Sequence, residues 1–357
     1  MYSGGAGLKV REYLKKKEIN LSWKTYFVTA MGAMAQGLFA SLLVGTILKT
    51  IGEWTGGGFL IEIAGFAMDG KVVGACIGVA VAASLKASGL VLFSSSVVGA
   101  IGYVIGATIN EQAFTAGPAG AFVATVIACE LGKLVNKETK VDILVTPLVT
   151  ILSGYGIAKL LCPAIAYAMY YLGEFINTTT ELHPFFMGII ISVVVGMLLT
   201  LPISSAAICA MIGISGLAGG AATVGCCCQM VGFAVMSFRE NRWGGLVAQG
   251  LGTSMLQMGN IIKRPAVWIP TILSSAILGP VSTMAFGMVN EKVSAGMGTC
   301  GLVGPLGVIA ATEEKGLLFW IGLMLLCFVL PAALTLLFSE IMRKLGWIRN
   351  GDLKLEI

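Results

Sequence analysis

PFFMGIIISVVVGMLLTLPISSAAICAMIGISGLAGGAATVGCCCQMVGFAVMSF, residues 184–238, is the stretch that decides the fold. It contains no Asp, Glu, Lys or Arg. Because a helix needs roughly 20 apolar residues to cross a bilayer, this stretch has room for about two crossings. Of all 357 residues, 57% are hydrophobic and 11% are charged, whereas about 25% of the residues in a soluble domain are charged. The sequence therefore predicts an all-α polytopic membrane protein.

Apolar runs along the rest of the chain predict about eight to ten transmembrane helices. The expected spans are 25–47, 71–88, 89–109, 118–135, 141–161, 163–176, 185–201, 203–236 in one or two pieces, 265–287 and 316–339. Two further runs, 244–260 and 294–311, are too short or too rich in glycine to cross, so we expect them to be re-entrant elements.

Basic residues gather at the two ends of the apolar region. Lys9, Arg11, Lys15, Lys16 and Lys17 precede the first run, and Arg343, Lys344, Arg349 and Lys354 follow the last. By the positive-inside rule both termini are cytoplasmic and the number of crossings is even. We expect a cytoplasmic amphipathic segment at 1–22, a transport domain at 23–345 and a cytoplasmic tail at 346–357. The net charge of +5 therefore does not indicate nucleic-acid binding.

The glycine-rich predicted helices suggest that the sequence contains an internal repeat. GACIGVAVAASL, from Gly74, lies without gaps over GIIISVVVGMLL, from Gly188, and the same offset pairs Gly99 with Gly213. Repeats of this kind underlie many transporters and place the substrate site where the two halves meet. Helices rich in Gly, Val and Ile also resemble one another through composition alone, so both explanations stay open.

Three polar clusters interrupt the apolar runs, and the first is TLPISSAA, residues 200–207. Pro202 removes a backbone hydrogen bond, and Ser204 and Ser205 can bond to the carbonyl groups that are freed. Broken helices inside membranes are tolerated where they line a cavity. An ordinary proline kink explains the same residues equally well.

The second cluster contains QGLGTSMLQMGN, residues 249–260. On a helix, Gln249, Thr253 and Gln257 form one polar stripe, which Asn260 extends. Neutral amides and hydroxyls suit a sugar or polyol, because each group offers hydrogen bonds without the desolvation cost of a charge. Such stripes also hold neighbouring helices together. The segment is too short to span, which favours a solute site that faces a polar cavity.

Other candidate residues surround that stripe. Glu240 lies between Arg239 and Arg242, either in a solvated loop salt bridge or, with Asn241, at the mouth of the re-entrant element. The third cluster, NEKVSAGMGTCGLVG at 290–304, lacks the GK[ST] ending of a phosphate-binding loop. The candidate solute-binding residues are Ser204, Ser205, Gln229, Glu240, Asn241, Gln249, Thr253, Ser254, Gln257, Asn260, Asn290 and Thr299.

Catalytic and metal-binding motifs are missing from the sequence. There is no GxSxG, HExxH or DxD motif, and His183 is the single histidine. Cys226, Cys227 and Cys228 lie in a small-residue stretch and are more typical of buried packing than of redox chemistry. No cofactor and no metal is expected, and a partner would have to supply any chemistry on a solute.

At TLPISSAAI, GGAATVGC, QMVGFAVMSFREN, QGLGTSMLQ and SAGMGTCGLVG the sequence resembles a known family. These are the stand-alone IIC-like inner-membrane proteins of the bacterial phosphoenolpyruvate sugar phosphotransferase system. Some members are labelled toxin regulators, like the perfringolysin O regulator. The resemblance extends from about Trp23 to Leu345. It implies a transporter, often a homodimer, that holds a sugar between re-entrant hairpins, while IIA and IIB proteins supply the phosphoryl group.

Well-studied sugar IIC proteins use a Glu and a His near the bound hydroxyl, and their motifs do not match cleanly here. Glu240 corresponds to the carboxylate only by its position in a polar cluster, and His183 does not fit the histidine. The leading hypothesis is a permease for a sugar or similar small polar solute. One alternative is a membrane-embedded solute sensor that signals through its basic N-terminal segment. Another is a secondary transporter for a non-sugar solute such as an organic anion, for which Lys86 is the one internal cation.

Overall fold

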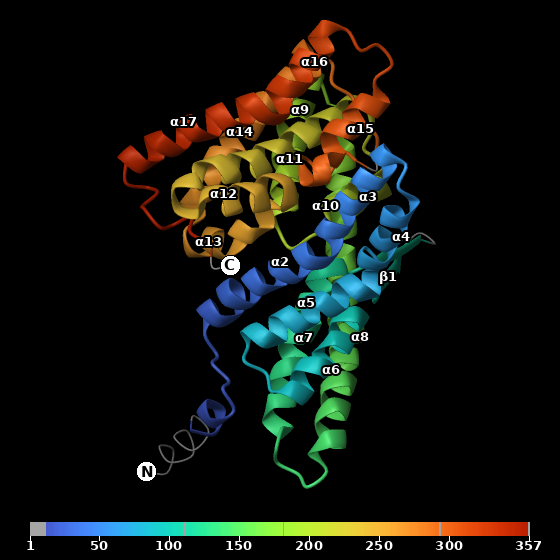
Figure 1. Cartoon of the computed structure of the whole chain (residues 1–357), viewed down its shortest axis with the longest axis vertical. Coiled ribbons are helices and arrows are strands. Elements are labelled where there is room, and N and C mark those ends of the chain that lie inside the picture. Colours follow the sequence, from blue (N-terminus) through green and yellow to red (C-terminus); the bar gives the residue numbers. More distant parts are fainter. Residues whose placement is uncertain (1–11, 110–111, 181, 293, 356–357) are drawn as a thin grey trace. The chain divides into compact units, whose positions relative to one another are not determined.

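The computed structural model describes residues 12–109, 112–180, 182–292 and 294–355. Nearly all of the regular structure is helical, as Figure 1 shows. Helices are expected in an apolar chain, because backbone groups in hydrocarbon must find their hydrogen bonds within the segment itself. The prediction of an all-α polytopic membrane protein is confirmed.

Among the described residues, six helical segments are long and apolar enough to cross a membrane. Two helices bent by 55°, Gly58–Ala67 and Gly70–Ser84, can count as a seventh, and three further apolar helices are shorter. The eight to ten crossings expected from the sequence are therefore reached only if some of these shorter helices also cross. The six are Lys24–Glu53, Gly117–Val135, Asp142–Ile176, Gly216–Met236, Pro265–Ala285 and Leu317–Lys344, and the three shorter ones are Gly89–Val104, Pro184–Thr200 and Cys300–Ala311.

The chain forms two compact units, which we describe separately. Unit 1 contains Met1–Ser41 and Asp69–Tyr167, and unit 2 contains Leu42–Met68 and Ala168–Ile357. The division falls within η2 (Phe39–Leu43) and within α8 (Asp142–Thr179).

Unit 1 is built around three helices that contact one another through small residues. A Cβ on Gly74 or Gly78 of α5 would collide with the backbone of α6, so glycine permits this close crossing. Val98 of α6, Ala124 of α7 and Cys162 of α8 are among the residues of its buried core. Its elements are η1 (Lys24–Ala30), α2 (Met31–Leu38), α5 (Gly70–Ser84), α6 (Gly89–Val104), β1 (Gly106–Ile109), β2 (Gln112–Thr115), α7 (Gly117–Val135) and the first part of α8.

Unit 2 surrounds the glycine-rich helix α11 (Gly216–Met236), whose most apolar 18-residue window is 94% buried. A Cβ on Gly225 would collide with the backbone of Ser192, so α9 can lie directly against α11. Cys226, Cys227 and Cys228 are buried in this helix.

The other helices of unit 2 follow α11 or precede it in the chain. Those before it are α3 (Val44–Thr55), α4 (Gly58–Ala67), the end of α8, α9 (Pro184–Thr200) and α10 (Ser205–Ile212). Those after it are α12 (Phe238–Val247), η3 (Ala248–Gly252), η4 (Ser254–Gln257), α13 (Met258–Lys263), η5 (Pro265–Trp268), α14 (Ile269–Pro280), η6 (Val281–Ala285), η7 (Cys300–Leu302), α15 (Val303–Ala311), α16 (Leu317–Met324), η8 (Leu325–Val329) and α17 (Leu330–Lys344).

Several expected boundaries are wrong. The two spans expected at 141–161 and 163–176 are one helix, α8, which continues through Pro147 and Pro163. Proline is tolerated inside membrane helices because neighbouring groups satisfy the freed carbonyl groups. The span expected at 89–109 ends at Val104, where the β1–β2 hairpin begins. Helix α4 was not expected, since Glu62 and the glycines at 56–58 interrupt its apolar pattern.

The glycines paired by the sequence offset occupy different backbone conformations. Gly99 lies inside α6, whereas Gly213 lies between α10 and α11 with φ of 71°. Gly102 is also helical, whereas Gly216 begins α11 with φ of 61°. These two pairs are therefore not structurally equivalent positions, whereas Gly74 and Gly188 both lie in helices.

Candidate solute site and the docked C-terminal segment

Residues 244–260 do not form one helix. The chain leaves η3 at Thr253, which is extended with φ of −158° and ψ of 142°, and it then enters η4 and α13. The Thr253 hydroxyl accepts the backbone N–H of Met255 at 3.1 Å and so caps the new helical turn. A local cap of this kind competes with continued helix. The expected single helical stripe is therefore wrong, although the segment also does not run on as a spanning helix.

The stripe residues nevertheless lie together, because the break folds the chain back on itself. Gln257 donates from Nε2 to Oε1 of Gln249 at 2.9 Å, and Asn260 donates to Oε1 of Gln257 at 2.7 Å. Gln249 also donates to Ser237 at the start of α12. Gln249 and Gln257 are completely buried. In this conformation they bind protein groups and face no water-filled cavity.

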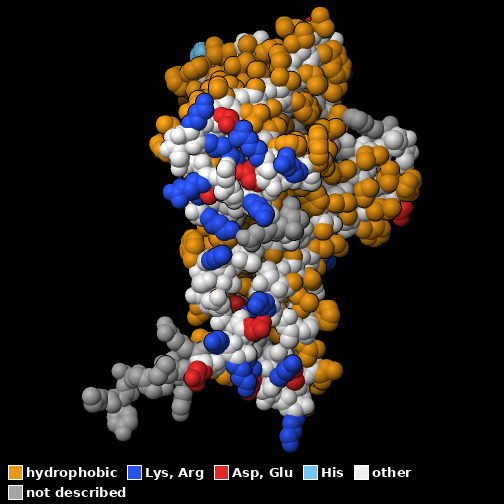
Figure 2. All heavy atoms as spheres, turned by 60° about the vertical axis from the view of Figure 1, so that its left-hand side comes forward, with side chains coloured by type: hydrophobic (Ala, Val, Ile, Leu, Met, Phe, Trp, Pro, Cys, Tyr) orange, Lys and Arg blue, Asp and Glu red, His pale blue; other side chains and the backbone are white. Residues whose placement is uncertain are grey.

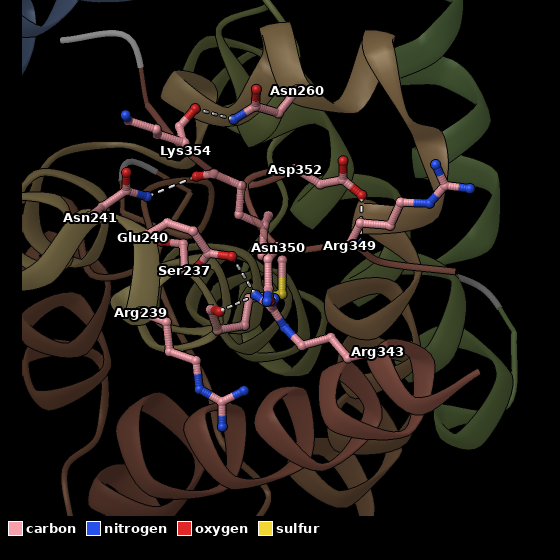
Figure 3. A network of polar contacts seen from close by, with 12 residues as sticks. Ser237, Arg239, Glu240, Asn241, Asn260, Arg343, Arg349, Asn350, Asp352 and Lys354 are labelled. Carbon is pink, nitrogen blue, oxygen red and sulfur yellow. Dashed lines mark hydrogen bonds and ion pairs between the residues drawn. The ribbon is translucent and has the colours of Figure 1, made fainter. Parts of the chain in front are cut away.

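Several amide side chains around the break form hydrogen bonds to the C-terminal segment of the same chain, residues 346–355. After α17 this segment returns toward α13, as Figure 1 shows. Asn241 donates to the carbonyl of Leu353 at 2.8 Å (Figure 3). It also accepts the N–H of Leu355 at 2.8 Å. Gln257 donates to the same Leu353 carbonyl at 3.0 Å, and Asn260 donates to the backbone carbonyl of Lys354 at 3.0 Å. Neutral amides thus hold the polar backbone of a segment that consists largely of turns.

Apolar and charged contacts fix the same segment. Ile348 and Leu353 are buried in a cluster with Phe233 of α11. Arg264 forms an ion pair with Asp352 at 3.0 Å. The tail expected at 346–357 is therefore, over its described residues, an integral part of unit 2.

Glu240 is engaged with Arg343 of α17, over 2.9 Å, and each side chain is only 9% exposed. Arg343 also donates to the carbonyl of Met236. The other Glu240 carboxylate oxygen is buried without a hydrogen-bond partner (Figure 3). Arg239 pairs instead with Glu340 at the surface. The bridge expected within the loop is thus replaced by a buried pair between distant parts of the chain.

Gln229, in the middle of α11, is the centre of a second buried cluster. Its Oε1 accepts the indole N–H of Trp268 at 2.9 Å and the hydroxyl of Thr271 at 2.8 Å. Thr200 approaches the same oxygen at 3.4 Å and bonds to Ser254 at 2.8 Å. Because indole nitrogen can only donate, the oxygen of the amide must face Trp268. Nε2 of Gln229 is therefore left buried without an acceptor.

The third cluster also reaches α11 and the break. Asn290 donates to Thr223 of α11 at 2.6 Å, and Thr299 donates to the carbonyl of Gly250 at 2.5 Å. Ser205 donates to the carbonyl of Gly296 at 2.7 Å, while Ser204 precedes it at the start of α10, half-buried. The candidates from all three clusters are thus close together in unit 2.

A cavity of about 420 Å³ lies beside the glycine-rich third cluster. Ser294 borders it together with Thr46, Thr50 and the Lys49–Glu53 ion pair of α3. The volume is within the range of about 300–1,000 Å³ that is usual for small-molecule pockets. Unit 2 therefore contains room for a small solute as well as buried polar groups.

Sequence reasoning missed Thr200, Trp268 and Thr271 as partners of Gln229. Thr200 stands in the quoted TLPISSAA stretch, and its place before Pro202 was an available signal. Trp268 and Thr271 lie in an apolar run that was read as an ordinary span, so nothing in the local pattern marked them.

The fold and these clusters define a polytopic helical membrane protein with a neutral, hydrogen-bonding interior in one unit. The family described as Phosphotransferase system, EIIC matches residues 28–355. The chain belongs to this family, whose members are membrane sugar permease components. Searches of curated proteins and of solved structures found no match.

Proposed function

We infer that this chain is an EIIC-type permease that binds a neutral, hydroxyl-rich solute of sugar size in unit 2. The observation that carries the proposal is the buried amide nitrogen of Gln229, which has no acceptor. A buried donor that is left unsatisfied costs about 1–3 kcal/mol. A hydroxyl oxygen of a bound sugar would accept from this nitrogen and remove that cost.

The groups around Gln229 fit the same class of solute. Thr200, Ser254 and Thr271 are fully buried hydroxyls, and each can both donate and accept. Trp268 adds a half-buried aromatic ring. Gln229, Trp268 and the hydroxyls are uncharged, which favours a neutral sugar over an organic anion.

The amide residues that hold the C-terminal segment belong to the same site. Ser254 begins η4 on the side of Gln229, and Gln257 ends it on the side of Leu353. A movement of this single turn would therefore change both contacts. Release of the segment would free Asn241, Gln257 and Asn260 for a solute on its path. Gln249 lies beside them, bonded to Gln257. The third cluster, with Asn290 and Thr299, would move with it and open the adjoining cavity.

Phosphorylation of the sugar by a separate IIB protein, itself charged by IIA, is the further part of this proposal. Figure 2 shows basic side chains gathered over α12, α13 and the C-terminal segment of unit 2. Arg239, Arg242 and Arg349 belong to these elements. From the positive-inside rule we expect such a face, and both termini, in the cytoplasm, where a phosphoprotein would dock. A homodimer in the bacterial inner membrane is the assembly that the family suggests.

A solute sensor, comparable to the toxin regulators of this family, is the second candidate. The observation that favours it is the N-terminal segment, which is docked on unit 1 by side-chain bonds such as Tyr13 to the carbonyl of Leu134 at 2.8 Å. A solute that altered this docking would change what a cytoplasmic partner meets. Deletion of residues 2–20 separates the functions, because sugar uptake survives in a permease whereas signalling is lost in a sensor.

The solute site is tested with Gln229→Leu in purified protein, by calorimetry and thermal unfolding over a panel of neutral sugars. Gln36→Leu, the same exchange in α2 of unit 1, is the matched control. We expect at least one sugar to bind wild type and the control, and to bind Gln229→Leu at least tenfold more weakly. Equal affinities in all three proteins would refute the site.

A further inference from the structure

A cavity of about 490 Å³ lies at the end of unit 1 where α7 passes into α8. Its lining is dominated by Lys16, Lys17, Lys86, Lys133 and Lys137, with two acidic residues, Glu18 and Glu138. A second cavity of about 840 Å³ shares Glu18, Lys86 and Lys133 with it. In the lower part of the view in Figure 2, basic and acidic side chains gather on the surface of unit 1.

The N-terminal segment forms one wall of the cavity and is firmly attached there. Residues 12–16 are helical. Lys17 donates to the carbonyl of Asn136 at 2.6 Å, and Lys133 donates to the carbonyl of Glu18 at 3.2 Å. These bonds bring Lys16 beside the ends of α5 and α7. The segment at 12–20 is thus a fixed part of unit 1.

The positive charge in the cavity is only partly neutralised. Lys17 pairs with Glu138 at 2.6 Å, and the buried Lys133 pairs with Glu130 at 2.9 Å. In the described part of the chain, Lys16, Lys86 and Lys137 have no ion-pair partner. Three unpaired ammonium groups around one concave surface raise the local concentration of anions.

Residues with positive φ are also concentrated around this cavity. Glu18, Lys86 and Lys137 have φ of 55°, 57° and 61°, and they are three of the five non-glycine residues with positive φ among those described. Each is the second residue after the last residue of a helix, a position where glycine usually occupies the left-handed conformation. Strained positions of this kind concentrate at functional sites. Three charged residues around one cavity thus occupy positions that glycine would adopt with less strain.

Hydrogen-bond donors complete the site. Ser88, which borders the cavity, stands before the first turn of the 16-residue helix α6. Its hydroxyl does not cap the helix and has no other partner. The first N–H groups of a helix have no partner within it, and they favour anions such as phosphate.

We propose that this cavity binds a phosphate group, either of a soluble phosphate compound or of an anionic lipid headgroup. Lys16, Lys86 and Lys137 would supply the charge, and the start of α6 would supply neutral donors. The site is in unit 1 and is separate from the neutral cluster around Gln229. The proposal therefore does not depend on which solute the permease carries.

Glycine substitutions test the charge without disturbing the fold, because glycine adopts positive φ without strain. Lys86→Gly with Lys137→Gly removes two positive charges, and Glu18→Gly removes one negative charge at the same kind of position. Calorimetry with inorganic phosphate and native mass spectrometry of phosphatidylglycerol binding provide the two measurements. Phosphatidylcholine is the neutral lipid control.

We expect wild type to bind one or both anions, the double lysine variant to bind at least tenfold more weakly and Glu18→Gly to bind more tightly. Binding of phosphate alone identifies a soluble ligand, and binding of phosphatidylglycerol alone identifies a lipid. If neither binds, or if all variants change affinity in the same direction, the proposal is wrong. Lys86→Asn, which also tolerates positive φ, replaces the double variant if that protein is unstable.

Discussion

Trp268 donates its indole N–H to Oε1 of Gln229 over 2.9 Å, and this bond decides which way the amide points. The oxygen also accepts from Thr271, and the amide nitrogen is left buried without an acceptor. Gln229, which lies in the most buried of the six candidate spans among the described residues, thus presents an unused donor, which is the feature that a solute hydroxyl can exploit.

Trp268→Phe should remove this orientation while it retains most of the apolar contact. We expect unfolding to become easier by about 1 kcal/mol, the usual contribution of one hydrogen bond. Sugar affinity should also fall, because the amide can then turn. Calorimetry and thermal unfolding measure both. Trp320→Phe, an exposed position in α16, is the control and should change neither quantity. If the affinity for sugar is unchanged in Trp268→Phe, Trp268 does not orient the Gln229 amide for binding.

Asn241→Ala should loosen the C-terminal segment. It removes one of the two donors to the Leu353 carbonyl, which keeps its bond from Gln257, and it removes the acceptor of the Leu355 N–H. A donor left without a partner costs about 1–3 kcal/mol when it is buried. Hydrogen exchange of residues 346–355 should therefore become faster. Asn350→Ala, which breaks only an exposed bond to Arg343, is the matched control. Equal exchange in the two variants would mean that Asn241 does not hold the segment.

The pair of Glu240 and Arg343 predicts strong coupling between two substitutions. Glu240→Ala leaves a buried guanidinium without its partner, and such a loss costs about 3–5 kcal/mol. Glu240→Ala combined with Arg343→Met removes both charges and should recover much of that stability. Thermal unfolding of the two single variants and the double variant gives the coupling. Additive effects of the two substitutions would show that the pair has no net interaction.

The sequence alone predicted the class of fold and most of the residues that meet in unit 2. Apolar length and missing charge are local properties, so α9 and α11 could be located without coordinates. The polar interruptions at 200–207, 249–260 and 290–304 were also visible, because an uncharged polar residue in an apolar run is conspicuous. Their convergence around α11 is now explained by bonds such as Thr299 to Gly250.

The partners of these residues could not be predicted, because they are far away in the chain. Gln257 and Leu353 are 96 residues apart, and Glu240 and Arg343 are 103 apart. No periodicity connects such positions. The break at Thr253 was also hidden, since it depends on one hydroxyl that caps the following turn. The polar residues at 249–260 could therefore be identified from the sequence, but the C-terminal segment that they bind could not.

Docking of the N-terminal segment should depend on pH through Glu138. The hydrogen bond and charge of Lys17 lower the pKa of Glu138 from its ordinary value of 4.5. Because the pKa is lower in the docked state, docking is favoured at pH above 4.5 and weakens as the pH falls through the lowered value. The anisotropy of a fluorophore on Asn20→Cys should therefore decrease in acid. Glu138→Gln should make docking weaker at neutral pH and remove most of the change in acid, since no proton then competes with Lys17. An unaltered pH profile in Glu138→Gln would assign the effect to another group.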